Sequence, residues 1–191
     1  MDRNQNMIGE QSYYYSRTVN GDLFSATDPN LVEVATYAGA ASRNRLMGNW
    51  RLEGNTRDES GNNNSGTLYG NAVLKRGYRG SGVLLDGSDD WVGVPHSSSL
   101  NITGSSITVS AWVKFNVANS YHFIVEKMAN IGRQYYMWWH PAGLIIVGYH
   151  DGSVFRDYSY AWTPTIGNWY HLAWTANGSN VRIYVNGALV A

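Results

Sequence analysis

The chain has 191 residues, of which 43% are hydrophobic, so it can build one sizeable core but hardly two. Its 14 basic residues balance 14 acidic ones without any block of like charge, which argues against binding to nucleic acid or to an anionic membrane surface. Because the sequence has no cysteine, disulfides, thiolate metal sites and cysteine catalysis are excluded. No apolar stretch has the length of a signal peptide or of a helix that inserts into a membrane.

The first 47 residues differ from the rest of the chain. They begin with a polar stretch and contain one run with helical character at 29–41, with Asp28 as its N-cap and Pro29 in its first turn. The small residues of this run fit an extended segment equally well. We therefore expect residues 1–47 to form a linker or attachment segment outside the main domain, which spans 48–191.

From residue 48 onward, short apolar and aromatic runs alternate with turn residues. The clearest run is 106–115, in which every second residue is apolar: Ile107, Val109, Ala111, Val113 and Phe115. Turn sequences separate further runs with strand character at 83–85, 91–94, 123–127, 134–140, 144–149, 154–158, 170–175 and 181–185. So many strands without a βαβ rhythm predict an all-β fold, an antiparallel β-sandwich of two packed sheets.

Several short motifs occur in the order and spacing of a known family. They are Asn-Trp-Arg-Leu at 49–52, Asp-Glu-Ser-Gly-Asn at 58–62, Gly-Thr at 66–67, the run 80–92, Ser-Ala-Trp-Val-Lys at 110–114 and the hairpin at 168–191. In this order they resemble a laminin-G-like domain of the concanavalin A-like jelly-roll family. The resemblance implies a jelly-roll sandwich in a secreted, cell-surface or virion protein that binds carbohydrate or protein, in some members with calcium.

The resemblance also implies strands that this sequence does not contain. The family continues beyond the position of Ala191, and one of its later strands pairs with the opening strand. Without them, an unpaired sheet edge has to be covered. We expect either residues 12–18, which include three consecutive tyrosines, to fold back as a strand, or a homo-oligomer to form through the uncovered edge or the amino-terminal segment. A fragment of a longer protein is the third alternative.

Two loops rich in aspartate, asparagine and glycine are candidates for a calcium site. The loop 58–65 and the turn 86–90 offer the carboxylate, amide and backbone oxygens that calcium prefers in a flexible site. The candidate ligands are Asp58, Asn62, Asp86 and Asp90. The same residue types suit any tight turn, so a purely structural role is the alternative. The five histidines lack a paired metal-binding spacing, which argues against zinc.

The run Tyr-Tyr-Met-Trp-Trp-His at 135–140 is the candidate sugar-binding strand. Sugar recognition needs flat aromatic faces that stack on C–H surfaces and planar polar groups that bond hydroxyls. On a strand, Tyr136, Trp138 and His140 face one side and the residues between them the other. We expect these three to bind the ligand, with Asp157 and Trp162 on a neighbouring rim. The alternative is that the aromatic residues on both sides fill two cores.

No pattern in the sequence predicts an enzyme. None of its five glutamates lies in the paired acidic strand pattern of glycoside hydrolases of this fold, and no nucleophile elbow or phosphate loop occurs. We therefore expect a non-catalytic recognition module for a glycan or a surface ligand. The alternative is a structural subunit of a virion or filament surface, in which the sandwich makes protein contacts.

Overall fold

The computed structural model describes residues 12–17, 46–101, 104–129 and 132–191, which form fourteen strands and one 3-10 turn, η2. None of the helical structure in these residues has the length and apolar character needed to cross a membrane. The elements are β1 Ser12–Arg17, β2 Leu46–Trp50, β3 Thr67–Tyr69, β4 Val73–Arg76, β5 Ser81–Leu84, β6 Trp91–Gly93, η2 Ser98–Leu100, β7 Ser106–Lys114, β8 His122–Ala129, β9 Gly132–His140, β10 Leu144–His150, β11 Phe155–Ala161, β12 Trp169–Asn177, β13 Val181–Val185 and β14 Ala188–Leu189.

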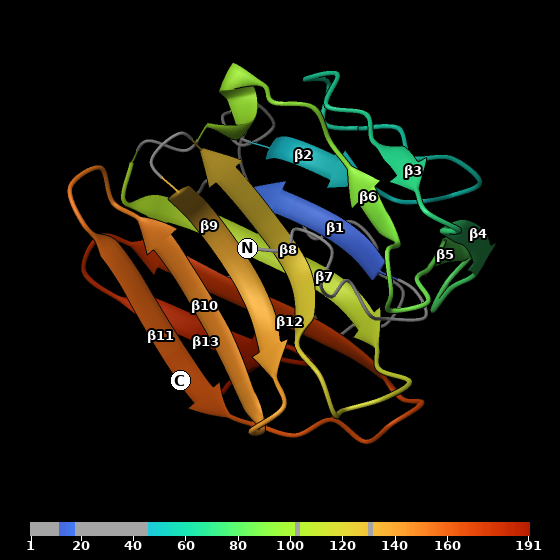
Figure 1. The fold of residues 1–191 in the computed structure, drawn as a ribbon. Coiled ribbons are helices and arrows are strands. Elements are labelled where there is room, and N and C mark those ends of the chain that lie inside the picture. The colour runs from blue at the N-terminus through green and yellow to red at the C-terminus, as the bar shows by residue number, and fades with distance from the viewer. Residues whose placement is uncertain (1–11, 18–45, 102–103, 130–131) are drawn as a thin grey trace.

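Two antiparallel sheets face each other (Figure 1). The larger has six strands in the order β14-β13-β12-β7-β1-β2, and the smaller has four in the order β11-β10-β9-β8. Two short two-stranded sheets, β3-β6 and β4-β5, lie beside the β2 end of the larger sheet. The antiparallel β-sandwich predicted from the sequence is confirmed, and the short strands β2, β3, β4 and β14 are additions to it.

The main core lies between the two sheets and follows from the alternation of apolar residues. Ile107, Val109 and Ala111 of β7 are fully buried against Met137 and Val147 of the opposite sheet. The polar residues between them on β7, Thr108 and Ser110, are also buried. The sequence pattern therefore identifies the core face correctly, whereas the burial of the second face has no apolar signature in the sequence.

Strand β1 brings the amino-terminal part of the chain into the larger sheet. Its residues pair antiparallel with β7, from Ser12 opposite Val113 to Arg17 opposite Thr108, and also with β2. This is the first of the alternatives derived from the sequence, an internal strand formed by residues near 12–18. The helical run expected at 29–41 lies outside the described residues, and the domain boundary at residue 48 stays a prediction.

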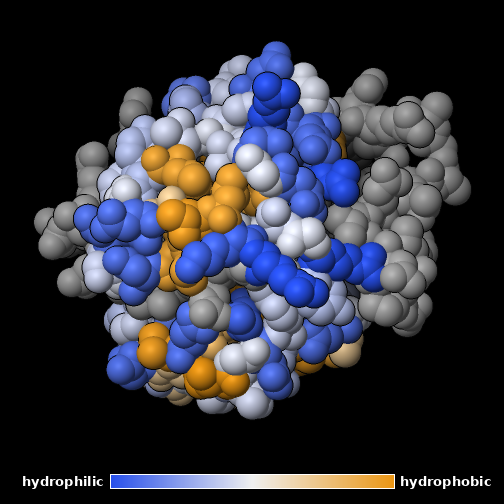
Figure 2. Space-filling model, turned by 90° about the vertical axis from the view of Figure 1, so that its right-hand side faces the viewer, coloured by the Kyte–Doolittle hydropathy of each residue, from blue (hydrophilic) through white to orange (hydrophobic). Residues whose placement is uncertain are grey.

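A second, smaller core lies beneath the β3-β6 and β4-β5 pairs. Trp50, Leu52, Val83 and Leu85 are buried together there, and the indole Nε1 of Trp50 donates to the carbonyl of Asn64 at 2.6 Å. The outside of this region is shown in Figure 2, where hydrophobic residues form small groups separated by hydrophilic surface. The loops that carry the candidate calcium ligands are thus anchored on a core of their own.

Candidate functional site

Strand β9 presents two different faces. Met137 and Trp139 point into the main core and are 0% and 1% exposed, whereas Tyr136, Trp138 and His140 lie on the outer face of the four-stranded sheet. The register places Gly148 of β10 beside Tyr136, and Asp157 of β11 beside Gly148. The alternation predicted for 135–140 therefore holds, and it brings three of the candidate residues onto one surface.

Six ring-bearing side chains cover this surface, and we call them the outer aromatic face: Tyr121, Phe123, Tyr136, Trp138, His140 and Phe155. The Trp138 ring stacks on Tyr136, with 4.4 Å between centroids, and meets Phe123 edge-on at 4.5 Å. Tyr136 in turn stacks on Phe155 at 5.7 Å with only 11° between the ring planes. These rings form one continuous array from β8 across β9 to β11.

The array has a buried middle and accessible ends. Tyr136 is only 4% exposed, whereas Phe155 and Tyr121 are 38% and 39% exposed, and Trp138 is partly exposed between them. A sheet face that points to solvent is ordinarily polar. Exposed aromatic side chains gathered on such a face indicate a recognition surface.

Tyr136 is held in place by Asp157. Its hydroxyl donates to the Asp157 carboxylate, and burial together with this carboxylate raises the pKa of Tyr136 well above its usual value. The phenol therefore remains protonated and keeps donating at any physiological pH. This leaves the second oxygen of Asp157 as an acceptor beside the rings.

Charged and polar groups border the rings on the other side. The guanidinium of Arg133 lies 4.3 Å from the centroid of the Trp138 ring, and its Nε donates to Oε1 of Glu126 at 2.6 Å. His140 Nδ1 accepts from the backbone N–H of Ala142 at 2.9 Å, so in the neutral ring Nε2 carries the proton and donates to the Tyr121 hydroxyl. The face thus combines flat rings with hydrogen-bond donors and hydrogen-bond acceptors, both charged and neutral.

Gly148 is necessary for this arrangement. A Cβ atom built at this position would lie 2.6 Å from Oδ1 of Asp157 and 2.7 Å from the hydroxyl of Tyr136, because the tyrosine crosses above it. We expect Gly148→Ala to separate Tyr136 from Asp157 and to destabilise the fold by about 1–3 kcal/mol, as overpacking does. Urea denaturation would measure this, with Gly104→Ala as the control, since nothing lies within 4 Å of a Cβ there. Equal free energies of unfolding for the two variants would contradict the view that Gly148 leaves the space in which Tyr136 meets Asp157.

Trp162 does not join the outer aromatic face. Its ring lies among the core aromatics, 4.8 Å from Tyr170 and 6.2 Å from Phe115, and its carbonyl accepts from Trp139 Nε1 at 3.1 Å. The structure therefore brings together Tyr136, Trp138, His140 and Asp157 and places Trp162 on the other side of the sheet.

Five residues of the face were not identified from the sequence: Tyr121, Phe123, Glu126, Arg133 and Phe155. Phe155 shares the parity of Asp157 along its strand, so alternation alone could have found it. In a regular strand Arg133 would alternate onto the core side, but the register of β9 against β8 shifts by one residue between Tyr135 and Arg133, and the Arg133 guanidinium lies over Trp138. The others depend on the register of β8 against β9, which shifts at two places.

Of the calcium candidates, Asp58 and Asn62 hold the loop 58–65 against β2. Oδ1 of Asp58 accepts from the N–H groups of Asn49 and Ser60 at 2.9 Å each, and Oδ2 accepts from Asn64 N–H at 2.9 Å. The amide of Asn62 donates to the carbonyl of Leu46 at 2.7 Å. These bonds are those of a tight, self-bonded loop.

Asp86, Asp89 and Asp90 form a separate acidic triad, with their ligand atoms within 4.8 Å of one another. Asp90 is buried and accepts from the backbone N–H groups of Asn71 and Asp86, while Asp86 and Asp89 are exposed. Among the described residues Asp58 is not part of this group. Asp89 lies in the turn 86–90 but was not among the ligands selected from the sequence.

Comparison with known proteins agrees with this architecture. A family model described as the concanavalin A-like lectin/glucanases superfamily matches residues 86–191, and no curated protein matches the chain by sequence. A solved structure, domain 4 of AbnA, a GH43 extracellular arabinanase from Geobacillus stearothermophilus in complex with arabinotriose, is similar with a TM-score of 0.53 and 20% identity. The alignment covers 73% of this chain and 69% of the other. Since the family model spans more than half of its residues and the sandwich has the expected sheets, the chain belongs to the concanavalin A-like lectin/glucanases superfamily.

Proposed function

We propose that this protein is a non-catalytic module that binds carbohydrate through its outer aromatic face. The observation that carries the proposal is the continuous array of rings centred on Trp138 and bordered by Arg133, Glu126 and Asp157 on the solvent side of the four-stranded sheet. Aromatic rings offer apolar contact to sugar C–H groups, and the bordering side chains offer planar donors and acceptors to hydroxyls.

Arg133 also fits a ligand-binding role. It covers the ring of Trp138, but its side chain is 45% exposed, as is common for weak surface ion pairs. An exposed pair such as Arg133 with Glu126 contributes about 0–1 kcal/mol, so a ligand can move the guanidinium at small cost. Once moved, both groups remain beside the ligand as hydrogen-bonding partners.

Binding is favoured over catalysis because the acids of the face are already engaged. In the described structure Glu126 is paired with Arg133 and Asp157 with Tyr136, so neither carboxylate is presented to a ligand as a free acid or base, the state in which glycoside hydrolysis uses its two acids. The similar arabinanase domain, solved with arabinotriose, supports an oligosaccharide as the ligand class. We further propose an extracellular, cell-surface or virion location for the protein, as for the secreted modules that the family resemblance implies.

A glycan-array screen of the intact chain tests the proposal. We expect selective binding to a small set of glycans and no hydrolysis of them, because the rings and polar groups present a fixed pattern of contacts. Assembly of the protein without any glycan binding would contradict it and would favour a structural subunit instead.

We also propose that the acidic triad Asp86, Asp89 and Asp90 holds calcium. Its carboxylate oxygens are the ligands that calcium prefers, and the two exposed aspartates leave room for water. Calcium that binds only the folded state stabilises it by mass action, by about 2.7 kcal/mol at a hundredfold excess over the dissociation constant.

A melting curve in calcium and in EDTA measures this effect. We expect calcium to raise the melting temperature of the protein and of Asp58→Asn, and to leave that of Asp89→Asn unchanged. A melting temperature that does not respond to millimolar calcium would contradict the metal site. A response lost only in Asp58→Asn would place the site in the loop 58–65.

A further inference from the structure

Strand β11 is an open edge of the four-stranded sheet. Among the described strands it pairs with β10 alone, and six of its seven residues are exposed. Its ladder with β10 runs through all seven residues without a register shift, whereas β8 at the opposite edge breaks its ladder at two places. A regular, exposed edge strand presents unpaired backbone N–H and C=O groups that can pair with another chain.

β11 lacks most of the usual protections against such pairing, and its two charged residues are already engaged, Arg156 with Asp151 and Asp157 with Tyr136. Its sequence, Phe-Arg-Asp-Tyr-Ser-Tyr-Ala, contains no proline, lysine or glycine, and its exposed residues include Phe155 and Tyr158, which is 39% exposed. By contrast, the edge strand β14 has only two residues. Of the edges with described side chains, β11 is therefore the longest regular one open to pairing.

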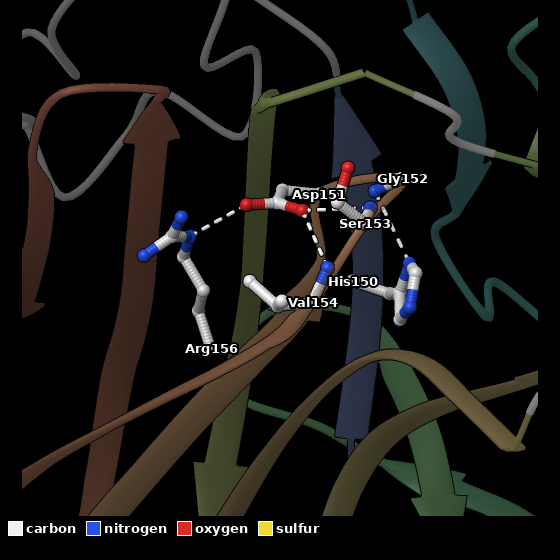
Figure 3. Close-up of polar contacts among 6 residues, drawn as sticks. All are labelled: His150, Asp151, Gly152, Ser153, Val154 and Arg156. Atoms are coloured by element: carbon white, nitrogen blue, oxygen red, sulfur yellow. Dashed lines mark hydrogen bonds and ion pairs between the residues drawn. The ribbon is translucent and has the colours of Figure 1, made fainter.

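The turn of the hairpin that leads into β11 is held by a network of hydrogen bonds (Figure 3). Asp151 accepts from the backbone N–H groups of Ser153 and Val154 at 2.9 Å each and from Nε of Arg156 at 2.6 Å, while His150 Nδ1 accepts from Gly152 N–H. Backbone hydrogen bonds and Arg156 hold the pKa of the Asp151 carboxyl well below its usual range, so these contacts persist at neutral pH. The edge is thus presented in a fixed conformation.

We propose that two copies of the chain pair through β11, antiparallel, about a two-fold axis at Tyr158. Residues that face each other on paired strands must lie on the same face of the sheet, so the axis has to pass through a residue and not between two. The pairs are then Tyr158 with Tyr158, Asp157 with Ser159, Arg156 with Tyr160, and Phe155 with Ala161.

The side chains select this register. An axis at Asp157 would place two carboxylates directly opposite each other, and an axis at Arg156 two guanidinium groups, both of which are unfavourable. An axis at Ser159 would leave Asp157 opposite Ala161. The axis at Tyr158 gives an aromatic pair at the centre and, on each side, Arg156 against the ring of Tyr160, while the edge of its guanidinium keeps its bond to Asp151.

This dimer has a consequence for binding that depends on the proposed function. The two four-stranded sheets become one sheet of eight strands, and antiparallel pairing places both outer aromatic faces on the same side. The two β9 strands are then five strand spacings apart, roughly 24 Å. The inferred ligand class is therefore a polymer with repeated sugar epitopes, which both faces bind together with a gain in avidity.

The molecular mass in solution tests the pairing without any glycan. We expect sedimentation analysis of the intact chain to show twice its mass of 21.3 kDa, in equilibrium with monomer. Tyr158→Lys and Tyr158→Glu, each with an unchanged melting transition, should be monomeric because like charges meet at the axis. An equimolar mixture of the two variants should dimerise again. A monomeric parent chain, or a dimer that survives both substitutions, would overturn the proposal.

Disulfide trapping tests the register. Because the chain has no cysteine, Tyr158→Cys can cross-link only between copies, and we expect it to do so rapidly on mild oxidation. Ser153→Cys, at the hairpin tip, is the control and should remain uncross-linked; equal rates of cross-linking would overturn the register.

The monomeric Tyr158 variants separate failure of the dimer from failure of the glycan proposal. They should keep the affinity of the parent chain for a single glycan epitope and lose only the additional avidity for polymers.

Discussion

Trp139→Ala is expected to destabilise the protein by about 3–5 kcal/mol, the range found when a buried tryptophan is truncated. Its ring is 1% exposed, lies 5.8 Å from Phe115 and 5.3 Å from His122, and donates from Nε1 to the carbonyl of Trp162. Truncation would leave a cavity between the sheets and an unsatisfied carbonyl. Since small domains are stable by only about 5–15 kcal/mol, a large share of the stability should be lost.

The neighbouring residue provides the matched control. Trp138 has the same side chain on the outer face, where it is partly exposed, so Trp138→Ala removes ring contacts without opening the core. Urea denaturation should show a clearly smaller loss for Trp138→Ala, of about 1–2 kcal/mol. Equal losses for the two variants would mean that the outer aromatic face is a second core.

His171 should make the stability depend on pH below neutrality. Burial lowers its pKa from the ordinary value of 6.5 to about 4, and neither ring nitrogen has a hydrogen-bond partner among the described residues. The unfolded state therefore binds more protons between these two values. Stability should be complete above about pH 6.5 and decrease as the pH falls toward 4, by about 3 kcal/mol in total.

The control for this prediction is His171→Leu, which keeps the volume and removes the titrating group. At pH 7 it should be about as stable as the parent chain, since both ring nitrogens are unpaired, and at pH 5 it should be more stable. Urea denaturation at several pH values gives the difference between the two proteins. A difference that does not change between pH 7 and 5 would contradict the neutral, buried histidine.

The strand alternation in the sequence predicted much of the fold and part of the site. Alternate residues at 135–140 separate into core and outer face as expected, and the apolar residues of 106–115 line the core. Asp157, which was expected on a neighbouring rim, accepts a hydrogen bond from the Tyr136 hydroxyl. These features depend on local periodicity, which the sequence contains directly.

The remaining features depend on contacts between distant residues. Arg133 and Phe123 both lie beside Trp138 on a ladder between β8 and β9 whose register shifts at two places. Trp162 follows the end of β11, where alternation no longer defines its direction, and its ring packs among core aromatics. Asp89 joins Asp86 and Asp90 through the path of a turn. None of these contacts has a periodic signature in the sequence.

Calorimetric titration of the best glycan from the array into two variants tests the binding face most directly. Trp138→Ala lies at the centre of the outer aromatic face, and Tyr69→Ala lies in an exposed aromatic pair outside this face, where Tyr69 of β3 stacks on Trp91 of β6 at 4.8 Å. We predict that Trp138→Ala, still folded, binds at least about tenfold more weakly, a loss of about 1.4 kcal/mol, and that Tyr69→Ala binds as the parent chain does. Unchanged binding by Trp138→Ala, or loss of binding in Tyr69→Ala, would contradict the outer aromatic face as the site.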